Sequence, residues 1–172
     1  GLIIDDRANG GGNVSPMILE RLSREPYRLT MRRGSARIGT VPDAVQVGPK
    51  VCLINKYSAS DGDLFPWGFR ALGLGKLIGT RTWGGIVGIS GSLPYMDGTD
   101  IRVPFFTSFD PKTGSWIIEN HGVDPDILID NDPVKEWNGE DQQLDRAIQE
   151  VMKELQNRKP LPGVPTPRDF SK

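Results

Sequence analysis

Ser60 stands at a point in the sequence where its hydroxyl could act as a nucleophile. The apolar residues 51–54 are followed by small and polar residues, a pattern that predicts a buried strand ending in a tight turn. Apolar residues then recur at helical spacing through 64–72, so Ser60 precedes the first turn of a helix. A hydroxyl there is surrounded by unpartnered backbone N–H groups, which suits a nucleophile whose product is an oxyanion. The pattern equally fits a serine N-cap, with Asp63 completing a capping pair, and both interpretations stay open.

The glycine run at 10–12 predicts a second turn that could contribute to a functional site. It follows the apolar residues 2–4 and precedes residues 14–22, which predict an amphipathic helix. The apolar stripe of that helix is formed by Val14, Ile18 and Leu22, with Met17 beside it. Consecutive glycines lose much conformational entropy on folding, so they indicate a close backbone approach or a positive φ. The spacing and ending of a phosphate-binding loop are missing, and a plain strand-to-helix turn remains the alternative.

Composition and charge exclude several classes of protein. The 172 residues suffice for one domain with its own core, and 37% hydrophobic with 25% charged residues is typical of a soluble globular protein. The net charge of −1 and the lack of a dense basic stripe argue against a nucleic-acid binder. No apolar run approaches the length of a membrane span.

Few residues of this chain could hold a metal ion or a cofactor. Asp124 and Asp126 form an acidic pair, but no histidine or further carboxylate completes a ligand set. The single cysteine, Cys52, cannot form an internal disulfide, and its apolar surroundings favour a small buried hydrophobe. We therefore expect no metal ion and no cofactor.

The order of the predicted elements indicates the fold class. Residues 2–4, 51–55 and 76–80 predict strands, and residues 14–22 and 61–72 predict the helices between them. Strands that alternate with helices in this way predict an α/β protein with a parallel sheet flanked by helices.

The remainder of the chain is turn-rich and ends in a helix and a tail. Alternating residues predict a half-buried strand at 27–31, and the Gly- and Pro-rich residues 32–50 predict an irregular connection. Further elements are predicted as hairpin arms at 88–94 and 99–105 around an Asp97-Gly98 turn, short strands at 116–119 and 127–129, and a terminal helix at 141–155 with Leu144, Ile148, Val151 and Leu155 on its apolar side. The proline-rich residues 158–172 predict an extended tail, which places the folded domain at 1–157.

Four segments, taken together and in this order, carry a resemblance to a known family. They are Asp-Arg-Ala-Asn-Gly-Gly-Gly at 6–12, Ser-Ala-Ser-Asp-Gly-Asp at 58–63, Gly-Thr-Arg-Thr-Trp-Gly-Gly at 79–85, and Glu-Asn-His-Gly-Val-Asp-Pro-Asp at 119–126. With the terminal helix after them, the chain resembles the tail-specific and tricorn group of serine peptidases over nearly its whole length. The resemblance implies a crotonase/ClpP-like α/β core and hydrolysis of peptide bonds through an acyl-enzyme.

The resemblance also separates two branches of this group. In the tail-specific branch a lysine serves as the base, and its position is occupied here by Gly85. The tricorn branch uses a serine nucleophile, a histidine base, a second serine and a glutamate. Ser60 and Glu119 look like the nucleophile and the glutamate of that branch.

The same resemblance implies the surroundings of the nucleophile. Backbone N–H groups of Asp61 and Gly11 are expected to form the oxyanion hole. Trp83, which is followed by two glycines, is expected near the cleft, where it forms a wall with Gly84 and Gly85 or serves simple packing.

The chain departs from the tricorn pattern because it lacks the expected base. Its single histidine, His121, lies two residues after Glu119 and would share a face with it in an extended segment. The family's histidine lies instead upstream of the glycine run, in a segment that would precede Gly1. We therefore expect the isolated chain to be catalytically incomplete, with His121 as the alternative base.

Two other functions fit the same fold. One is a non-enzymatic ligand-binding module, and the other is a crotonase-type acyl-CoA enzyme. Retention of Ser60, the glycine run and Glu119 favours the peptidase. Its expected partners are a peptide or protein substrate, the missing N-terminal part of the same protein, and further copies of the chain. The proline-rich tail resembles that of secreted relatives, which favours a periplasmic or secreted location over the cytoplasm.

Overall fold

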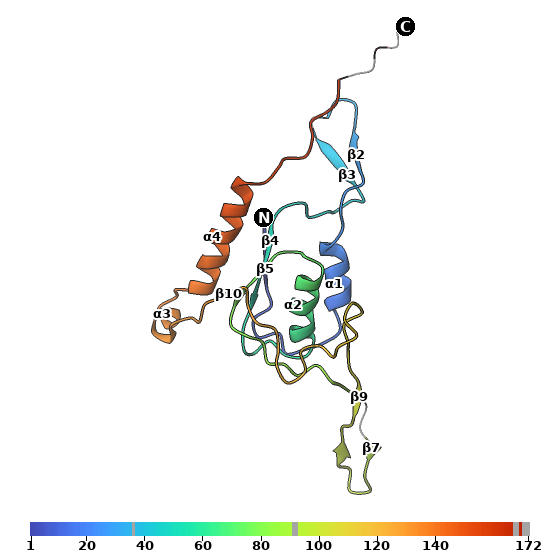
Figure 1. The fold of residues 1–172 in the computed structure, drawn as a ribbon, viewed down its shortest axis with the longest axis vertical. Helices are drawn as coiled ribbons and strands as arrows, with labels where there is room; N and C mark the ends of the chain where they lie inside the picture. The colour runs from blue at the N-terminus through green and yellow to red at the C-terminus, as the bar shows by residue number, and fades with distance from the viewer. Residues whose placement is uncertain (36, 91–92, 167–168, 170–172) are drawn as a thin grey trace.

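In the computed structural model, which describes residues 1–35, 37–90, 93–166 and 169, a four-stranded parallel sheet forms the centre of the fold (Figure 1). Its strands, in spatial order, are β1 (Leu2–Asp5), β4 (Lys50–Ile54), β5 (Lys76–Gly79) and β10 (Ile127–Leu128). Every neighbouring pair runs parallel, as the alternation of strands and helices predicts. The predicted α/β fold class is therefore confirmed.

Helices α1 (Ser15–Leu22) and α2 (Asp61–Ala71) lie on one side of the sheet (Figure 1). The buried apolar residues on this side are Leu19, Cys52, Ile54, Phe65, Phe69, Leu77 and Val123. The predicted apolar stripe of α1 is wrong in part, because Val14 and Ile18 are exposed and Leu19 is buried. Leu19 is drawn inward because it packs on Gly68 of α2, where an added Cβ would lie 2.5 Å from the Leu19 side chain.

Helix α4 (Gln142–Gln156) covers the opposite face of the sheet. The buried apolar residues here are Val51, Leu53, Ile78, Ala147 and Val151. Successive residues of β4 thus face opposite sides of the sheet, as the pleat requires, and this explains why the strand is apolar from Val51 to Ile54. The predicted helix is confirmed with bounds shifted by one residue, although Ile148 of its predicted stripe is 45% exposed.

An antiparallel hairpin of β2 (Arg28–Met31) and β3 (Ile38–Val41) projects at one end of the molecule. A strand is confirmed at Arg28–Met31, but the predicted half-burial is wrong, because Tyr27 (78%) and Met31 (59%) are exposed. The prediction of an irregular connection from 32 to 50 missed β3. Gly39 and the following proline hide the alternation of this strand in the sequence. The described part of the tail, residues 158–166 and 169, contains no helix or strand, and residues 162–165 line a hollow beside Leu29 and Met31.

A second projection, at the other end of the molecule, is built from short antiparallel strands (Figure 1). Strand β6 (Gly88–Ile89) pairs with β9 (Pro104–Phe106), and β7 (Leu93–Pro94) pairs with β8 (Asp100–Ile101). The predicted hairpin is therefore confirmed, except that Gly91 and Ser92 lie outside the described residues.

Two predictions for the later part of the chain need correction. Residues 116–119 do not form a strand: Trp116 makes one isolated bridge with Phe109, and the chain turns at Glu119. Positive φ angles at Asn120 (61°) and Gly122 (84°) then keep the chain from continuing as a strand after Glu119. Helix α3 (Pro133–Trp137) was not predicted, although Asp132 caps it and Pro133 opens it. No helix in the described ranges is long and apolar enough to cross a membrane.

Candidate active site

Ser60 lies between the end of β4 and the first residue of α2, as the sequence predicts. Its backbone has φ 57° and ψ −112°, a conformation that residues with a Cβ rarely adopt. Ser60 occupies the N-cap position of α2 and forms a capping box with Asp63, whose carboxylate accepts from the Ser60 N–H at 2.9 Å, so the capping interpretation is confirmed. The Ser60 hydroxyl is half-buried at this turn, so its place at the cap does not exclude chemistry there.

The glycine run packs directly against the Ser60 turn. The Asn9 carbonyl accepts a hydrogen bond from the Ala59 N–H (2.8 Å), and a Cβ at Gly62 would lie 2.2 Å from the same oxygen. Gly11 has a φ of 123°, and a Cβ there would lie 3.0 Å from the Ser60 Cβ. Both reasons suggested for consecutive glycines, close approach and positive φ, thus operate here.

The two amides expected to form the oxyanion hole differ in their present partners. The Asp61 N–H has no hydrogen bond within the described part of the chain. The Gly11 N–H donates to the Asn9 side-chain oxygen at 3.1 Å. Only the Asp61 amide is therefore free in this structure to meet an oxyanion without rearrangement.

The Asp61 side chain fastens the Ser60 turn to the start of α1. Its Oδ2 accepts hydrogen bonds from the N–H groups of Val14 and Ser15, both at 3.1 Å. The Ser15 hydroxyl donates in turn to the Asp61 carbonyl at 3.1 Å. The first helix is thus capped by a residue beside the candidate nucleophile, which lies far from it in sequence.

The Asp63 carboxylate joins the Ser60 turn to the predicted cleft wall. Its Oδ2 accepts from the Ser60 N–H (2.9 Å) and the Gly85 N–H (3.1 Å), and its Oδ1 accepts from the Gly84 N–H (2.7 Å). Trp83 is held nearby, since its N–H donates to the Ser58 carbonyl at 2.9 Å. The Trp83 ring is 67% exposed beside Gly85.

Glu119 is connected to the same wall from the other side. Its Oε2 accepts hydrogen bonds from the N–H groups of Ile86 (2.7 Å) and Val87 (3.0 Å). The Asn120 N–H donates to the Gly84 carbonyl at 2.7 Å. Asp63, the 84–87 segment and Glu119 therefore form one continuous set of contacts that begins at Ser60.

Asp6 is a buried carboxyl group beside this site that sequence reasoning missed. Its side chain accepts from Asn9 Nδ2 (2.9 Å) through Oδ1, while Oδ2 is buried without a partner among the described residues. Burial raises the pKa of Asp6 to about 7, and the charges of Asp61, Asp5 and Asp63 add to that rise against the Asn9 hydrogen bond. Only its place in the segment before the glycine run could have drawn attention to it.

His121 is directed toward Asp124 in this structure. Its Nε2 lies 2.9 Å from Asp124 Oδ2, and the Arg81 guanidinium donates to Asp124 Oδ1 at 2.7 Å. These contacts, His121 first, lower the pKa of Asp124. The residues after Glu119 turn instead of extending, so the expectation that His121 and Glu119 share a face of an extended segment is wrong.

The acidic pair near His121 is committed to protein contacts. Asp126 accepts from the Leu77 N–H at 2.7 Å and from the Arg70 guanidinium at 2.9 Å. Over residues 1–35, 37–90, 93–166 and 169, no three His, Cys, Asp or Glu side chains form a group that could hold a metal ion.

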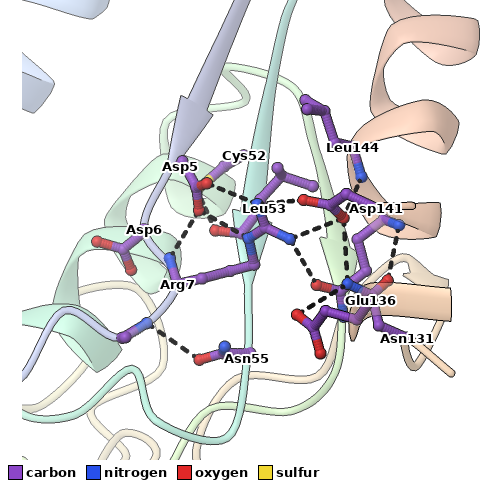
Figure 2. A network of polar contacts seen from close by, with 12 residues as sticks. Asp5, Asp6, Arg7, Cys52, Leu53, Asn55, Asn131, Glu136, Asp141 and Leu144 are labelled. Atoms are coloured by element: carbon purple, nitrogen blue, oxygen red, sulfur yellow. Dashed lines mark hydrogen bonds and ion pairs between the residues drawn. The ribbon is translucent and has the colours of Figure 1, made fainter. Parts of the chain in front are cut away.

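Arg7 connects the segment before the glycine run to the start of α4 (Figure 2). Its guanidinium donates to Asp5 (2.7 Å), Asp141 (2.9 Å) and Gln143 (3.1 Å). The contact with Arg7 is the main cause that lowers the pKa of Asp141 to about 2. The Asp141 carboxylate also caps α4 by accepting from the Leu144 N–H at 3.0 Å.

Comparison with known proteins gives consistent matches. The model of the family described as Peptidase family S41 matches residues 1–129. The tricorn protease of Thermoplasma volcanium is 44% identical over 162 residues, which cover 92% of this chain and 15% of that protein.

Solved structures agree with these matches. A crystal structure of the tricorn protease superposes with a TM-score of 0.83 at 42% identity, covering 91% of this chain and 15% of the other. The photosystem II D1 C-terminal processing protease gives a TM-score of 0.53 at 26% identity, covering 76% of this chain and 34% of the other. The chain thus spans about 15% of the length of the curated relative it matches.

Proposed function

The chain belongs to peptidase family S41, and on this premise we propose that it is the C-terminal portion of a serine peptidase domain with Ser60 as nucleophile. The observation that carries the proposal is the Ser60 turn. A non-glycine residue with φ 57° stands at the start of a helix, its hydroxyl is half-buried, and the next amide, that of Asp61, has no hydrogen bond among the described residues. These features suit acyl transfer and have no evident use in a carrier of apolar ligands.

The proposed reaction is hydrolysis of a peptide bond in two steps. Ser60 Oγ attacks the carbonyl carbon and gives its proton to a base, and the negative charge passes to the carbonyl oxygen. The C–N bond then breaks as the amine takes a proton, which leaves an ester on Ser60. Water releases the acid and restores the hydroxyl. The Asp61 N–H would stabilise the oxyanion, joined by the Gly11 N–H once it leaves Asn9.

We propose that the base comes from a part of the protein upstream of this chain. His121 is the single histidine of the sequence, and its ring is paired with Asp124 at 2.9 Å. The chain covers 15% of the length of the tricorn protease that it matches, which supports a further segment of the whole protein as the source of the base. The Oε1 atom of Glu119, which has no hydrogen bond in the described ranges, would bind a serine that orients that histidine.

The experiment that tests this proposal treats the full-length protein with a fluorophosphonate that labels active serines. Mass spectrometry should find the adduct on Ser60, and Ser60→Ala should abolish both labelling and peptide hydrolysis. Ser115→Ala, which removes an exposed hydroxyl, is the matched control and should behave as the wild type. A Ser60→Ala variant within about tenfold of wild-type activity would refute the assignment, because loss of a nucleophile normally costs several orders of magnitude.

The same hydrolysis assay, applied to the isolated chain, tests whether the base comes from this chain or from an upstream part of the protein. The isolated chain of 172 residues should fold, since both faces of its sheet are covered, but it should not hydrolyse peptides at enzymatic rates. Cleavage by the isolated chain at ordinary rates would show that no upstream group is required.

A further inference from the structure

We propose that Asp63 is a positioning residue of this peptidase, whose buried carboxylate holds the Ser60 turn against the Gly84–Gly85 wall. This inference rests on the proposed role of Ser60 as nucleophile. It adds a second acidic residue to the site, one that neither touches the substrate nor exchanges a proton.

The first support is the complete use of the Asp63 carboxylate by backbone amides. The side chain has 0% solvent exposure, and it accepts from three N–H groups, those of Ser60, Gly84 and Gly85. An ionised carboxylate is an acceptor only, so three donors converging on it are matched without conflict. Such charge-assisted bonds are shorter and stronger than neutral ones, and the 2.7 Å bond from Gly84 fits that description.

The second support is the conformation that these bonds maintain at the nucleophile. The Ser60 backbone is strained at φ 57°, and strained residues persist only where their surroundings hold them in place. The Ser60 N–H bond to Asp63 Oδ2, at 2.9 Å, acts on the strained residue itself. On the other side of the turn, Asp61 is tied to α1. Asp63 therefore supplies the fixed point on the side of the cleft wall.

The third support is the continuation of this contact toward Glu119. Gly84 has φ 88°, and a Cβ there would lie 2.5 Å from the Gly122 nitrogen, so the Gly84 backbone is pressed against the turn that follows Glu119. The Gly84 carbonyl accepts from the Asn120 N–H at 2.7 Å. A shift of Asp63 would thus move Ser60 relative to Glu119. These two residues lie on segments that are distant in sequence.

Replacement of Asp63 by asparagine keeps the shape of the side chain but leaves too few acceptors for the three N–H groups of Ser60, Gly84 and Gly85. Whichever way the new amide is turned, its NH2 group faces at least one backbone N–H that now has no acceptor. We expect the turn to relax by a fraction of an ångström to about 1 Å, and displacement of that size is enough to lower kcat about 100-fold. Substrate contacts are not removed, so KM should stay within about threefold.

The test compares Asp63→Asn with Glu150→Gln in the full-length protein. Glu150 is a matched control because its carboxylate is also buried (1% exposed) but pairs with Lys76 and Arg146 on the far face of the sheet. The measurements are kcat and KM on a fluorogenic peptide, the rate of Ser60 labelling by a fluorophosphonate, and the thermal midpoint. Asp63→Asn should lower kcat and the labelling rate together. Glu150→Gln should lower only the thermal midpoint.

A folded Asp63→Asn variant with kcat within threefold of wild type would overturn the inference, as would an equal loss of kcat in Glu150→Gln. If Asp63→Asn does not fold, Asp63→Glu decides, because it keeps the charge and displaces the carboxylate by one methylene. Unchanged kcat in folded Asp63→Glu would also overturn the inference. Failure of the proposed function is distinguishable, since Ser60 would then be neither labelled nor required in the wild type.

Discussion

Replacing Asp6 by asparagine should change how the stability of the chain depends on pH. In the folded chain, burial raises the pKa of Asp6 to about 7 from an ordinary value of 3.8. The folded state then binds the Asp6 proton more tightly than the unfolded state does. The free energy of unfolding should therefore fall as pH rises from about 4 to about 7 and level off above that range.

The size of this effect follows from the pKa difference. A shift of about three pKa units corresponds to about 4 kcal/mol of lost stability at pH 8, at about 1.4 kcal/mol per unit. About 1.5 kcal/mol of that loss is already present at pH 5, because an unfolded Asp6 would be ionised there. The remaining ~2.5 kcal/mol is lost between pH 5 and pH 8. Asp6 is only 6% exposed, so solvent screening reduces this figure little.

The assay is urea unfolding of the isolated chain at pH 5, 6, 7 and 8, followed by tryptophan fluorescence, for the wild type and Asp6→Asn. The stability of Asp6→Asn relative to the wild type should rise by about 2.5 kcal/mol from pH 5 to pH 8. Comparing two pH values cancels the constant cost of burying the new amide, which is about 1–3 kcal/mol.

A matched control separates this effect from a general loss of one negative charge. Asp130→Asn removes an exposed carboxylate. Its free energy of unfolding should differ from that of the wild type by the same amount at all four pH values. Parallel curves for Asp6→Asn and the wild type would refute the reasoning. So would a midpoint below pH 5 for the Asp6 carboxyl carbon in an NMR titration.

Three further predictions concern other residues of the site and its supports. Glu119→Gln should lower kcat about 10- to 100-fold with a smaller change in KM, since the group orients and does not react; steady-state kinetics in which KM alone changes would contradict this. His121→Gln in the full-length protein should keep activity within about threefold, whereas a loss of 100-fold or more would identify His121 as the base. Asp141, whose pKa is lowered to about 2 mainly by Arg7, stabilises the folded chain above pH 3.8, and this contribution disappears as pH falls through about 2. Asp141→Asn should therefore cost about 2 kcal/mol at pH 7 and almost nothing near pH 2 in denaturant unfolding; equal losses at both would refute the assignment.

The elements that the sequence predicts correctly are those defined by their own local pattern. Residues 51–54 are apolar without interruption because both faces of β4 are covered, and such a run can be recognised without knowing what packs on it. The position of Ser60 follows from the same kind of local signal, because a strand, a turn and a helix come in direct succession.

The features that were missed depend on contacts between distant segments. Leu19 is buried because Gly68 leaves room for it, and no pattern within α1 alone shows that. The turn at Glu119 depends on positive φ angles at Asn120 and Gly122, one of which is not a glycine. The burial of Asp6 and the three amides around Asp63 arise only when the glycine run, α2 and the 84–87 segment meet. The sequence therefore indicates Ser60 as a candidate nucleophile, whereas the contacts that hold it in place arise only in the tertiary structure.

The Arg7 contacts have a consequence for where the working unit of this protein ends. The family model stops at residue 129, yet Arg7 is bound by Asp141 and Gln143 at the start of α4 (Figure 2). Arg7 lies two residues before Asn9, whose carbonyl supports the Ser60 turn. A protein shortened to residue 129 would therefore lack two acceptors of Arg7. It would also lack α4, which covers one face of the sheet. Transplanting the candidate site into another scaffold, or comparing it among relatives, should include the residues up to Gln156.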